Sequence, residues 1–332
     1  MMSDAFRIDG INIEVTNSCP LRCPQCYCSL EGGSHISIER VYEILNEASN
    51  IGVSHIEFSG GETLCYPYIY DAIEFASRLG LSTSISISGW GFDSNVLARL
   101  VKSGLDGLHV SLNASTKEKN DLSRDGYELS IRALEIISEF RYNAATINWV
   151  MHRNTADDLQ NMVKLAEKYR VSSILVMDPK PDSKNELFTY PTKEQLINTA
   201  QIIRNNVSSV DIEVHHCFSV LAALVGDNKL WGNLNRGLYR GCTAGLCSLS
   251  VSVDGSFIPC RHLELHEEFD SIAEYWHSSH VLNKIRDIGE VLRSPCDKCR
   301  LSRYCRHCLA VNKKLHNEIF FGNEFCPLLE NS

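Results

Sequence analysis

The chain has 332 residues and lacks three features that would each indicate a particular class of protein. It has no excess of positive charge, since 32 Lys and Arg stand against 41 Asp and Glu for a formal charge of −9. This balance argues against a nucleic-acid-binding protein, because phosphate contacts need a basic face. No run of about 18 apolar residues suggests a membrane span. The N-terminal MMSDAFRIDG has no basic segment followed by an apolar stretch, so we expect no secretion signal and a cytoplasmic location.

Cysteine, in contrast, is abundant, with 14 in the chain. Reducing compartments disfavour disulfides, so clustered thiols in a cytoplasmic protein are more often metal ligands or redox centres. The length is enough for two domains or one large one. The positions of the cysteines therefore become the main guide to function.

Strand-like and helix-like segments alternate up to about residue 180. The expected strands are Gly10–Thr16, His55–Ser59, Ser82–Ser88, Gly107–Asn113, Ala145–His152 and Ser173–Met177. The expected helices are a segment with apolar positions at Ile38, Val41, Tyr42 and Leu45, followed by Ile69–Leu79, Asn95–Lys102, Tyr127–Phe140 and Ala156–Tyr169. Six such repeats predict a parallel sheet or barrel with right-handed crossovers.

One face of the first four strands is polar, although buried parallel strands are normally apolar on both faces. The polar positions are Asn12/Glu14/Thr16, His55/Glu57/Ser59, Ser84/Ser86/Ser88 and His109/Ser111/Asn113. Side chains alternate between the faces of a strand, so these residues share one face of the sheet. We expect this face to line a polar cavity inside a barrel, the alternative being an open sheet with one solvated face.

The pattern changes after about Asn205. Residues 206–240 look irregular, and from Cys242 onward eight cysteines fall within 85 residues. We therefore divide the chain into a first domain over residues 1–205, a linker over 206–240 and a small cysteine-rich domain over 241–330.

The segment NSCPLRCPQCYC, Asn17–Cys28, follows the first strand. Cys19, Cys23 and Cys26 form a C-x3-C-x2-C loop at the carboxyl edge of the sheet, where β/α barrels place their active sites. A closed zinc or iron–sulfur site needs four ligands, so three thiolates leave one corner of a metal centre open for catalysis. Cys28 is a possible fourth ligand, although it lies only two residues beyond Cys26.

The segment SGGET, Ser59–Thr63, ends the second strand. Two glycines let the backbone approach a ligand closely, and Glu62 beside them can accept hydrogen bonds from an ammonium group. On its own, this segment is equally consistent with a simple strand-to-helix turn.

Together, these two segments on a β–α repeat resemble the radical S-adenosylmethionine (SAM) enzymes, over roughly residues 8–205. The resemblance implies a partial (β/α)6 TIM-like barrel in which Cys19, Cys23 and Cys26 bind a [4Fe–4S] cluster, with SAM on its fourth iron. The family usually has an aromatic residue just before the third cysteine, where this chain has Gln25, with Tyr27 just after Cys26.

The same resemblance implies the residues that contact SAM. They are Gly60, Gly61 and Glu62 with the methionine amino group, Ser111 with the ribose, Arg124 with the methionine carboxylate, and Ser88 in the pocket wall. The alternatives are that Ser111 is a lumen residue without contact and that Arg124 is a surface charge.

The C-terminal cysteines would provide two complete four-thiolate sites for either zinc or iron–sulfur clusters. Cys242-x12-Gly255-x4-Cys260 and Cys296-x2-Cys299-x5-Cys305 resemble the SPASM domain that follows some radical SAM barrels. The resemblance implies one auxiliary [4Fe–4S] cluster on Cys242, Cys247, Cys260 and Cys308, and a second on Cys296, Cys299, Cys305 and Cys326. The interval from Cys305 to Cys308 is one residue shorter than is usual in the family. Three cysteines remain unassigned: Cys28, Cys65 and Cys217.

The implied function is reductive cleavage of SAM to a 5′-deoxyadenosyl radical, which takes a hydrogen atom from a peptide or protein substrate, as in maturation of ribosomal peptides. A flavodoxin- or ferredoxin-type electron donor is implied. Because the cluster loop begins at Cys19, we expect any peptide-recognition module to be absent or supplied by a separate protein. The maturases of sulfatases have Asp after the residue equivalent to Cys260. This chain has Arg261 there, which argues against sulfatase maturation as its function.

Two alternatives remain open. The first is a radical SAM enzyme that acts on a small molecule, such as a haem or cofactor precursor. The second is a non-catalytic iron–sulfur or zinc protein. Production of 5′-deoxyadenosine separates the enzyme from the non-catalytic protein.

Overall fold

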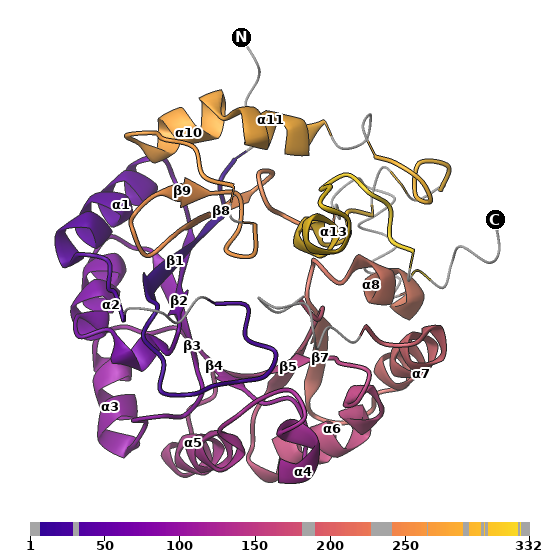
Figure 1. Cartoon of the computed structure of the whole chain (residues 1–332). Coiled ribbons are helices and arrows are strands. Elements are labelled where there is room, and N and C mark those ends of the chain that lie inside the picture. The colour runs from indigo at the N-terminus through magenta and orange to yellow at the C-terminus, as the bar shows by residue number, and fades with distance from the viewer. Residues whose placement is uncertain are drawn as a thin grey trace.

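Parallel strands form the centre of the computed structural model, which describes residues 7–28, 33–180, 190–226, 241–263, 265–287, 292–299, 302, 305–324 and 326. In this part of the chain the sheet has nine strands in the order β7-β6-β5-β4-β3-β2-β1-β8-β9, curved into an open barrel (Figure 1). The strands are β1 (Gly10–Thr16), β2 (His55–Gly60), β3 (Ser82–Ile87), β4 (Gly107–Ser111), β5 (Ala145–Val150), β6 (Ser173–Met177), β7 (Asp211–Val214), β8 (Ser248–Val251) and β9 (Phe257–Ile258).

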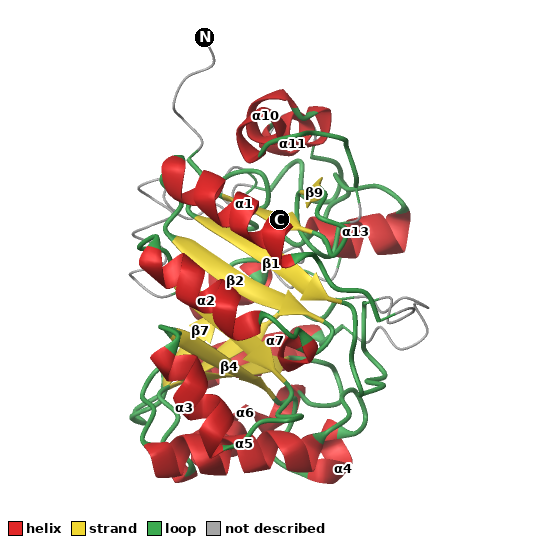
Figure 2. Cartoon of the chain, turned by 90° about the vertical axis from the view of Figure 1, so that its left-hand side faces the viewer, coloured by secondary structure: helices red, strands yellow, loops and turns green. Residues whose placement is uncertain are grey.

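Helices cover the outer face of this sheet (Figure 2). The helices of the barrel are α1 (Ile38–Asn50), α2 (Ile69–Arg78), α3 (Ser94–Lys102), α4 (Lys117–Asn120), α5 (Tyr127–Phe140), α6 (Leu159–Lys168) and α7 (Lys193–Arg204), with the 3-10 turns η1 (Thr63–Cys65) and η2 (Ala156–Asp158). The later helices are α8 (Ser219–Val225), α10 (Ile272–Ser278), α11 (His280–Arg286) and α13 (Leu309–His316).

The predicted alternation of strands and helices is confirmed, with β1, β6 and α5 at the expected bounds. Local sequence explains where the helices start: the side chain of Ser37 accepts a hydrogen bond from Arg40 N at the start of α1, and Asp93 does the same for Val96 N in α3. Thr192 forms a capping box with Gln195 at the start of α7. These caps satisfy N–H groups that have no partner within their own helix.

The apolar faces of strands and helices meet in one continuous core. In β1, Ile11, Ile13 and Val15 are buried, and in α1 the buried residues include Val41 and Leu45. Burying a side chain of this size contributes about 1.5–3 kcal/mol. The core therefore fixes which face of each strand points inward, and hence which residues reach the lumen.

The sheet does not end where the sequence suggested a linker and a second domain. Within the described part of residues 206–240, β7 pairs in parallel with β6, and α8 packs on α7. From the cysteine-rich region, β8 pairs in parallel with β1, with Gly10 opposite Ser248 and Ile13 opposite Val251. The short β7 has the half-exposed pattern of an edge strand, so its sequence, Asp-Ile-Glu-Val, gives little signal. Residues 227–240 of the expected linker lie outside the described residues.

The barrel is partial, because β7 and β9 are the two ends of the sheet and do not pair with each other. Helix α13 lies beside this opening (Figure 1). Its residues belong to a second, small apolar cluster, which comprises Leu263, Ile285, Cys308, Leu309, Ala310 and Val311. The cysteine-rich region thus both extends the sheet and covers the open side. Among the described residues, no helix combines the length and the apolar character that a bilayer crossing requires.

Candidate active site

The polar face of the sheet lines an internal cavity of about 420 Å³, which we call the lumen cavity. Its wall contains polar residues predicted from β1 to β4: Asn12, His55, Glu57, Ser84, Ser86, His109, Ser111 and Asn113. The predicted polar lumen is therefore confirmed. Several buried polar atoms at this wall have no hydrogen-bond partner among the described residues, including Asn12 Nδ2, His109 Nδ1 and His262 Nδ1. A cavity with unpaired donors and acceptors suits a polar ligand.

A second cavity of about 140 Å³, the loop cavity, lies at the carboxyl ends of the strands. It brings together all nine residues predicted for the cluster and for SAM: Cys19, Cys23, Cys26, Gly60, Gly61, Glu62, Ser88, Ser111 and Arg124. These residues come from the ends of four strands and the loops after them. The two cavities are adjacent, since Ser111 and Arg124 line both.

The two glycines of the Gly-Gly-Glu segment let the cysteine loop lie directly on β2. A Cβ on Gly60 would overlap the carbonyl oxygen of Thr16, and a Cβ on Gly61 would overlap that of Ser18. Gly60 also has φ near +139°, a conformation that other residues rarely adopt. Gly61 N donates to Thr16 O at 2.7 Å, and Glu62 N donates to Ser18 O at 2.8 Å. Glycine is therefore required here to bring the backbone of SGGET against the cysteine loop.

Glu62 is buried and tied to the neighbouring strand end. Its Oε2 accepts from the backbone N of Ser88 at 2.8 Å and from the Ser88 hydroxyl, while Oε1 accepts from Leu64 N at 3.2 Å. Burial raises the pKa of Glu62, an effect that the Ser88 hydrogen bonds oppose. A carboxylate oxygen has two lone-pair sites, so Oε1 keeps one for a ligand donor. The turn interpretation and the ligand interpretation of Gly-Gly-Glu are therefore compatible.

The thiols of the loop differ in their environment. Burial raises the pKa of Cys19 to about 11, whereas a hydrogen bond from Cys28 lowers the pKa of Cys26 to about 6, with help from Arg124. Arg124 Nε is buried without a hydrogen-bond partner among the described residues. Three thiols, an unpartnered guanidinium nitrogen and a free carboxylate lone pair fit a metal cluster that carries an amino-acid ligand.

Gln25, in the position where the family usually has an aromatic residue, fastens the cysteine loop to the barrel. Its Oε1 accepts from Asn113 Nδ2 at 2.9 Å and also contacts His152 Nε2, and its backbone N donates to Ser123 O. Tyr27, on the other side of Cys26, packs against His262 in a tilted arrangement, with ring centroids 4.1 Å apart and an interplanar angle of 59°. The Gln25 and Tyr27 contacts could not be predicted from the sequence, because both depend on residues more than 80 positions away.

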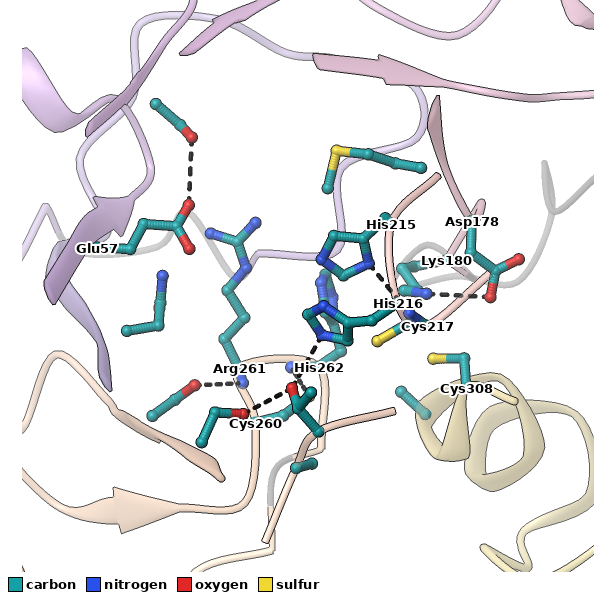
Figure 3. A pocket seen from close by; sticks show the side chains of 18 of the residues that line it. Glu57, Asp178, Lys180, His215, His216, Cys217, Cys260, Arg261, His262 and Cys308 are labelled. Atoms are coloured by element: carbon teal, nitrogen blue, oxygen red, sulfur yellow. Dashed lines mark hydrogen bonds and ion pairs between the residues drawn. The ribbon is translucent and has the colours of Figure 1, made fainter. Parts of the chain in front are cut away.

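The lumen cavity holds several charges that the sequence did not reveal as a group (Figure 3). The Arg261 guanidinium lies over the Tyr27 ring, 5.5 Å from its centroid. Burial would raise the pKa of Glu57, but the nearby Arg261 holds it below its usual value. Lys180 forms an ion pair of 3.1 Å with Asp178. Burial lowers the pKa of both His215 and His262, so these rings are neutral.

The four cysteines predicted for the second auxiliary site lie near one another. Cys299 N donates to Cys296 O at 3.0 Å. Burial raises the pKa of Cys305 to about 12, with further contributions from the charges of Cys326, Cys296 and Cys299. This grouping agrees with the ligand set expected for one cluster.

Three of the four cysteines predicted for the first auxiliary site line the lumen cavity. Cys242, Cys260 and Cys308 line the lumen cavity, and Cys247 does not. The previously unassigned Cys217 lines it instead. Among the described residues, the sulfur of Cys217 and one ring nitrogen each of His215 and His216 lie within 4.8 Å of one another. No sequence spacing links Cys217 to Cys242, because the connection runs through the fold.

Residues 13–166 match the Radical SAM superfamily. The chain carries a radical SAM domain. Among solved structures, Streptococcus suis SuiB bound to S-adenosylmethionine superposes with a TM-score of 0.79 at 16% identity, over 96% of this chain and 77% of SuiB. The enzyme anSMEcpe with bound AdoMet superposes with a TM-score of 0.72 at 17% identity, over 97% of this chain and 98% of anSMEcpe. The radical SAM domain supports the [4Fe–4S] and SAM expectation, and both structures share the fold of the cysteine-rich region as well as the barrel.

Proposed function

We propose that this chain is a radical SAM enzyme that modifies a peptide or protein substrate. The observation that carries the proposal is the adjacency of the two cavities: the loop cavity holds the three cysteines and opens, at Ser111 and Arg124, beside the polar lumen cavity. A reactive group held in the first would meet a substrate held in the second. In a β/α barrel this carboxyl end is where catalytic residues gather.

Each residue of the loop cavity has a defined part in this proposal. Cys19, Cys23 and Cys26 would hold a [4Fe–4S] cluster, and the remaining lone pair on Glu62 would accept from the amino group of SAM. Arg124 would pair with the SAM carboxylate, because its buried Nε needs an acceptor. When bound, the cluster and SAM supply a 5′-deoxyadenosyl radical that takes a hydrogen atom from the substrate. The buried walls of the lumen would keep water away and hold the substrate in place.

Peptide substrates are favoured by the structures that share this fold. SuiB has been solved bound to the precursor peptide SuiA, and anSMEcpe has been solved with a Cp18Cys peptide. The lumen of this chain has room and unpaired polar atoms for a side chain. A small-molecule substrate remains the second candidate, because the same cavity would accept one.

Arg261 is the residue we assign to substrate positioning. It lines the loop cavity and the lumen cavity, and it forms no ion pair shorter than 4 Å with a carboxylate of the described residues. A guanidinium in that position would bind an anionic or carbonyl group of the substrate, with Glu57 beside it as an acceptor for a donor group. It cannot act as a general base, since arginine stays protonated. The general base, if the reaction needs one, would lie elsewhere in the lumen.

The cysteine-rich region would hold two auxiliary [4Fe–4S] clusters that accept the electron released when a substrate radical is oxidised. A flavodoxin- or ferredoxin-type protein would supply the electron for SAM cleavage. We also include a separate peptide-recognition protein among the proposed partners.

The test uses the reconstituted, oxygen-free enzyme with SAM, dithionite and peptides translated from short reading frames beside its gene. We expect the mass of one peptide, measured by mass spectrometry, to decrease by the mass of the hydrogen atoms removed. When that peptide is deuterium-labelled, we expect deuterium to enter 5′-deoxyadenosine. A Cys23→Ala variant is the matched control and should leave the peptide unchanged. Deuterium transfer from a small metabolite, with none from any peptide, would favour the small-molecule candidate instead.

A further inference from the structure

Cys217 is held at the edge of the barrel by backbone contacts on both sides. His215 N donates to Val176 O at 2.9 Å and so extends the β6–β7 ladder, and Phe218 N donates back to His215 O at 2.8 Å. Between these two contacts, Cys217 N donates to His215 Nδ1 at 3.3 Å. The turn before α8 therefore has a fixed shape that points Cys217 into the lumen cavity (Figure 3).

One carbonyl group ties this turn to the cysteine-rich region. Arg306 O accepts from Ser219 Oγ at 2.6 Å and from Cys242 N at 2.7 Å. This carbonyl therefore brings together three positions: Ser219, two residues after Cys217; Cys242; and Arg306, two residues before Cys308. A Cβ on Gly241 would overlap this same carbonyl, so the glycine is needed for the close approach. Three of the four chain segments that carry cysteines in this region meet at one point.

The thiols themselves interact. The side chains of Cys217 and Cys242 lie within hydrogen-bonding reach of each other. The Cys260 thiol lies close enough to Cys242 and Cys308 for their charges to act on it. All four thiols line the lumen cavity, and Figure 3 shows Cys217, Cys260 and Cys308 around the same space.

Cys247 is placed differently. It lies in the turn just before β8, where its carbonyl accepts from Asp9 N at 2.8 Å and from Gly10 N at 3.3 Å. This is the amino end of β1, where Gly10 and Ser248 line the lumen cavity but Cys247 does not.

We propose that Cys217, rather than Cys247, completes the ligand set of Cys242, Cys260 and Cys308. This inference rests on the proposed function only in taking the bound group to be an iron–sulfur cluster; the ligand set applies equally to zinc. Four thiolates form a closed site for either. The Lys180 ammonium group lies close enough to Cys217 and Cys308 to interact with both electrostatically, and it would offset part of the negative charge of four thiolates. A barrel turn and the cysteine-rich region would then share one metal centre.

The test compares Cys217→Ser with Cys247→Ser in a parent in which Cys19, Cys23 and Cys26 are all alanine, so that only C-terminal sites bind metal. The reconstituted parent should hold about 8 iron atoms per chain, and Cys217→Ser should lose about half of them or show an altered Mössbauer spectrum. Cys247→Ser should match the parent, as should Cys65→Ser, a variant of another unassigned cysteine. Full iron and an unchanged spectrum in Cys217→Ser would overturn the proposal. An effect of Cys247→Ser as large as that of Cys217→Ser would do so too.

Two further readouts keep the outcome clear. If the parent binds zinc instead of iron, the auxiliary iron–sulfur clusters are wrong, but a loss of one zinc in Cys217→Ser and none in Cys247→Ser would still support the ligand set. If Cys217→Ser does not fold, alkylation of the metal-loaded parent decides the question. Cys217 should be protected from iodoacetamide until a chelator removes the metal, and labelling before that step would contradict the assignment.

Discussion

The carboxylate of Glu62 accepts two hydrogen bonds from Ser88, one from its backbone N at 2.8 Å and one from its hydroxyl. The pair joins the loop after β2 to the end of β3 at the wall of the loop cavity. Because Glu62 is 1% exposed, its charge depends on these donors. The residue proposed to bind the SAM amino group is therefore positioned by a serine that a sequence motif does not include.

We expect Ser88→Ala to weaken SAM binding and to destabilise the protein by about 1–3 kcal/mol, the cost of leaving a buried carboxylate short of a donor. The measurement is SAM affinity of the reconstituted protein by calorimetry, with Ser94→Ala on the exposed start of α3 as the control. Equal affinity in the two variants would contradict this role.

The same pair predicts a pH dependence. Burial already raises the pKa of Glu62, and removal of the Ser88 hydroxyl takes away an opposing effect, so the pKa rises further in Ser88→Ala. The carboxylate form that binds an ammonium group exists above this pKa and is lost as pH falls through it. SAM affinity of the variant should therefore decline at a higher pH than that of the wild type, and a decline at the same pH would count against the assignment.

Gly61 offers a test of the close approach between SGGET and the cysteine loop. We expect Gly61→Ala to abolish SAM binding and to lower the iron bound at the first site, because a Cβ would overlap Ser18 O. Gly10→Ala is the matched control, since its Cβ would meet only His55 O at an ordinary 3.7 Å. Iron analysis and SAM binding of both variants make the comparison. Retention of both properties in Gly61→Ala would show that the loop is not held in this way.

Asn113 connects the cysteine loop to the barrel. Its Nδ2 donates to Gln25 Oε1 and to Ser123 Oγ, both at 2.9 Å, and its Oδ1 accepts from Val150 N at 3.2 Å. We expect Asn113→Ala to cost about 1–3 kcal/mol or more in stability, because these buried groups lose partners. Thermal unfolding should show a larger decrease than for the exposed Asn95→Ala. We also expect faster hydrogen exchange at Gln25 N. Unchanged exchange there would mean that Asn113 stabilises the protein without holding the cysteine loop to the barrel, which would contradict the prediction.

Removal of iron should affect the cysteine-rich region more than the barrel. The apolar cluster around Leu309 is small and separate from the main core, whereas β1–β4 share that core with the helices. Without metal, the thiolates around α13 lose the metal centre that holds them together. Hydrogen exchange after chelation should therefore rise in α13 before it rises in α5. Equal protection of α13 with and without iron would mean that the metal does not stabilise this region.

The barrel was predictable because its signals are local. Alternation in β1–β4 gave the strands, their polar face and the lumen, and the spacing of Cys19, Cys23 and Cys26 fixed one loop of the site. Glu62 and Arg124 were reached through the family resemblance, and the structure places them at the same cavity.

Other features could not be read from the sequence, because they depend on contacts between distant segments. The pairing of β8 with β1 joins residues more than 200 positions apart, so a domain boundary drawn from composition hid the continuous sheet. The family resemblance assigned Cys247 to the first auxiliary cluster and left Cys217 unassigned, yet the fold brings Cys217 next to Cys242. The role of Arg261 likewise depends on Tyr27 and Glu57, which come from other parts of the chain.

The most direct test is to purify and reconstitute the protein without oxygen, add SAM and dithionite, and measure 5′-deoxyadenosine and bound metal together. We predict 5′-deoxyadenosine and about 12 iron atoms per chain, with the product lost in Cys23→Ala while Cys65→Ala retains it. A protein that binds zinc at its C-terminal thiols and forms no 5′-deoxyadenosine would contradict the account.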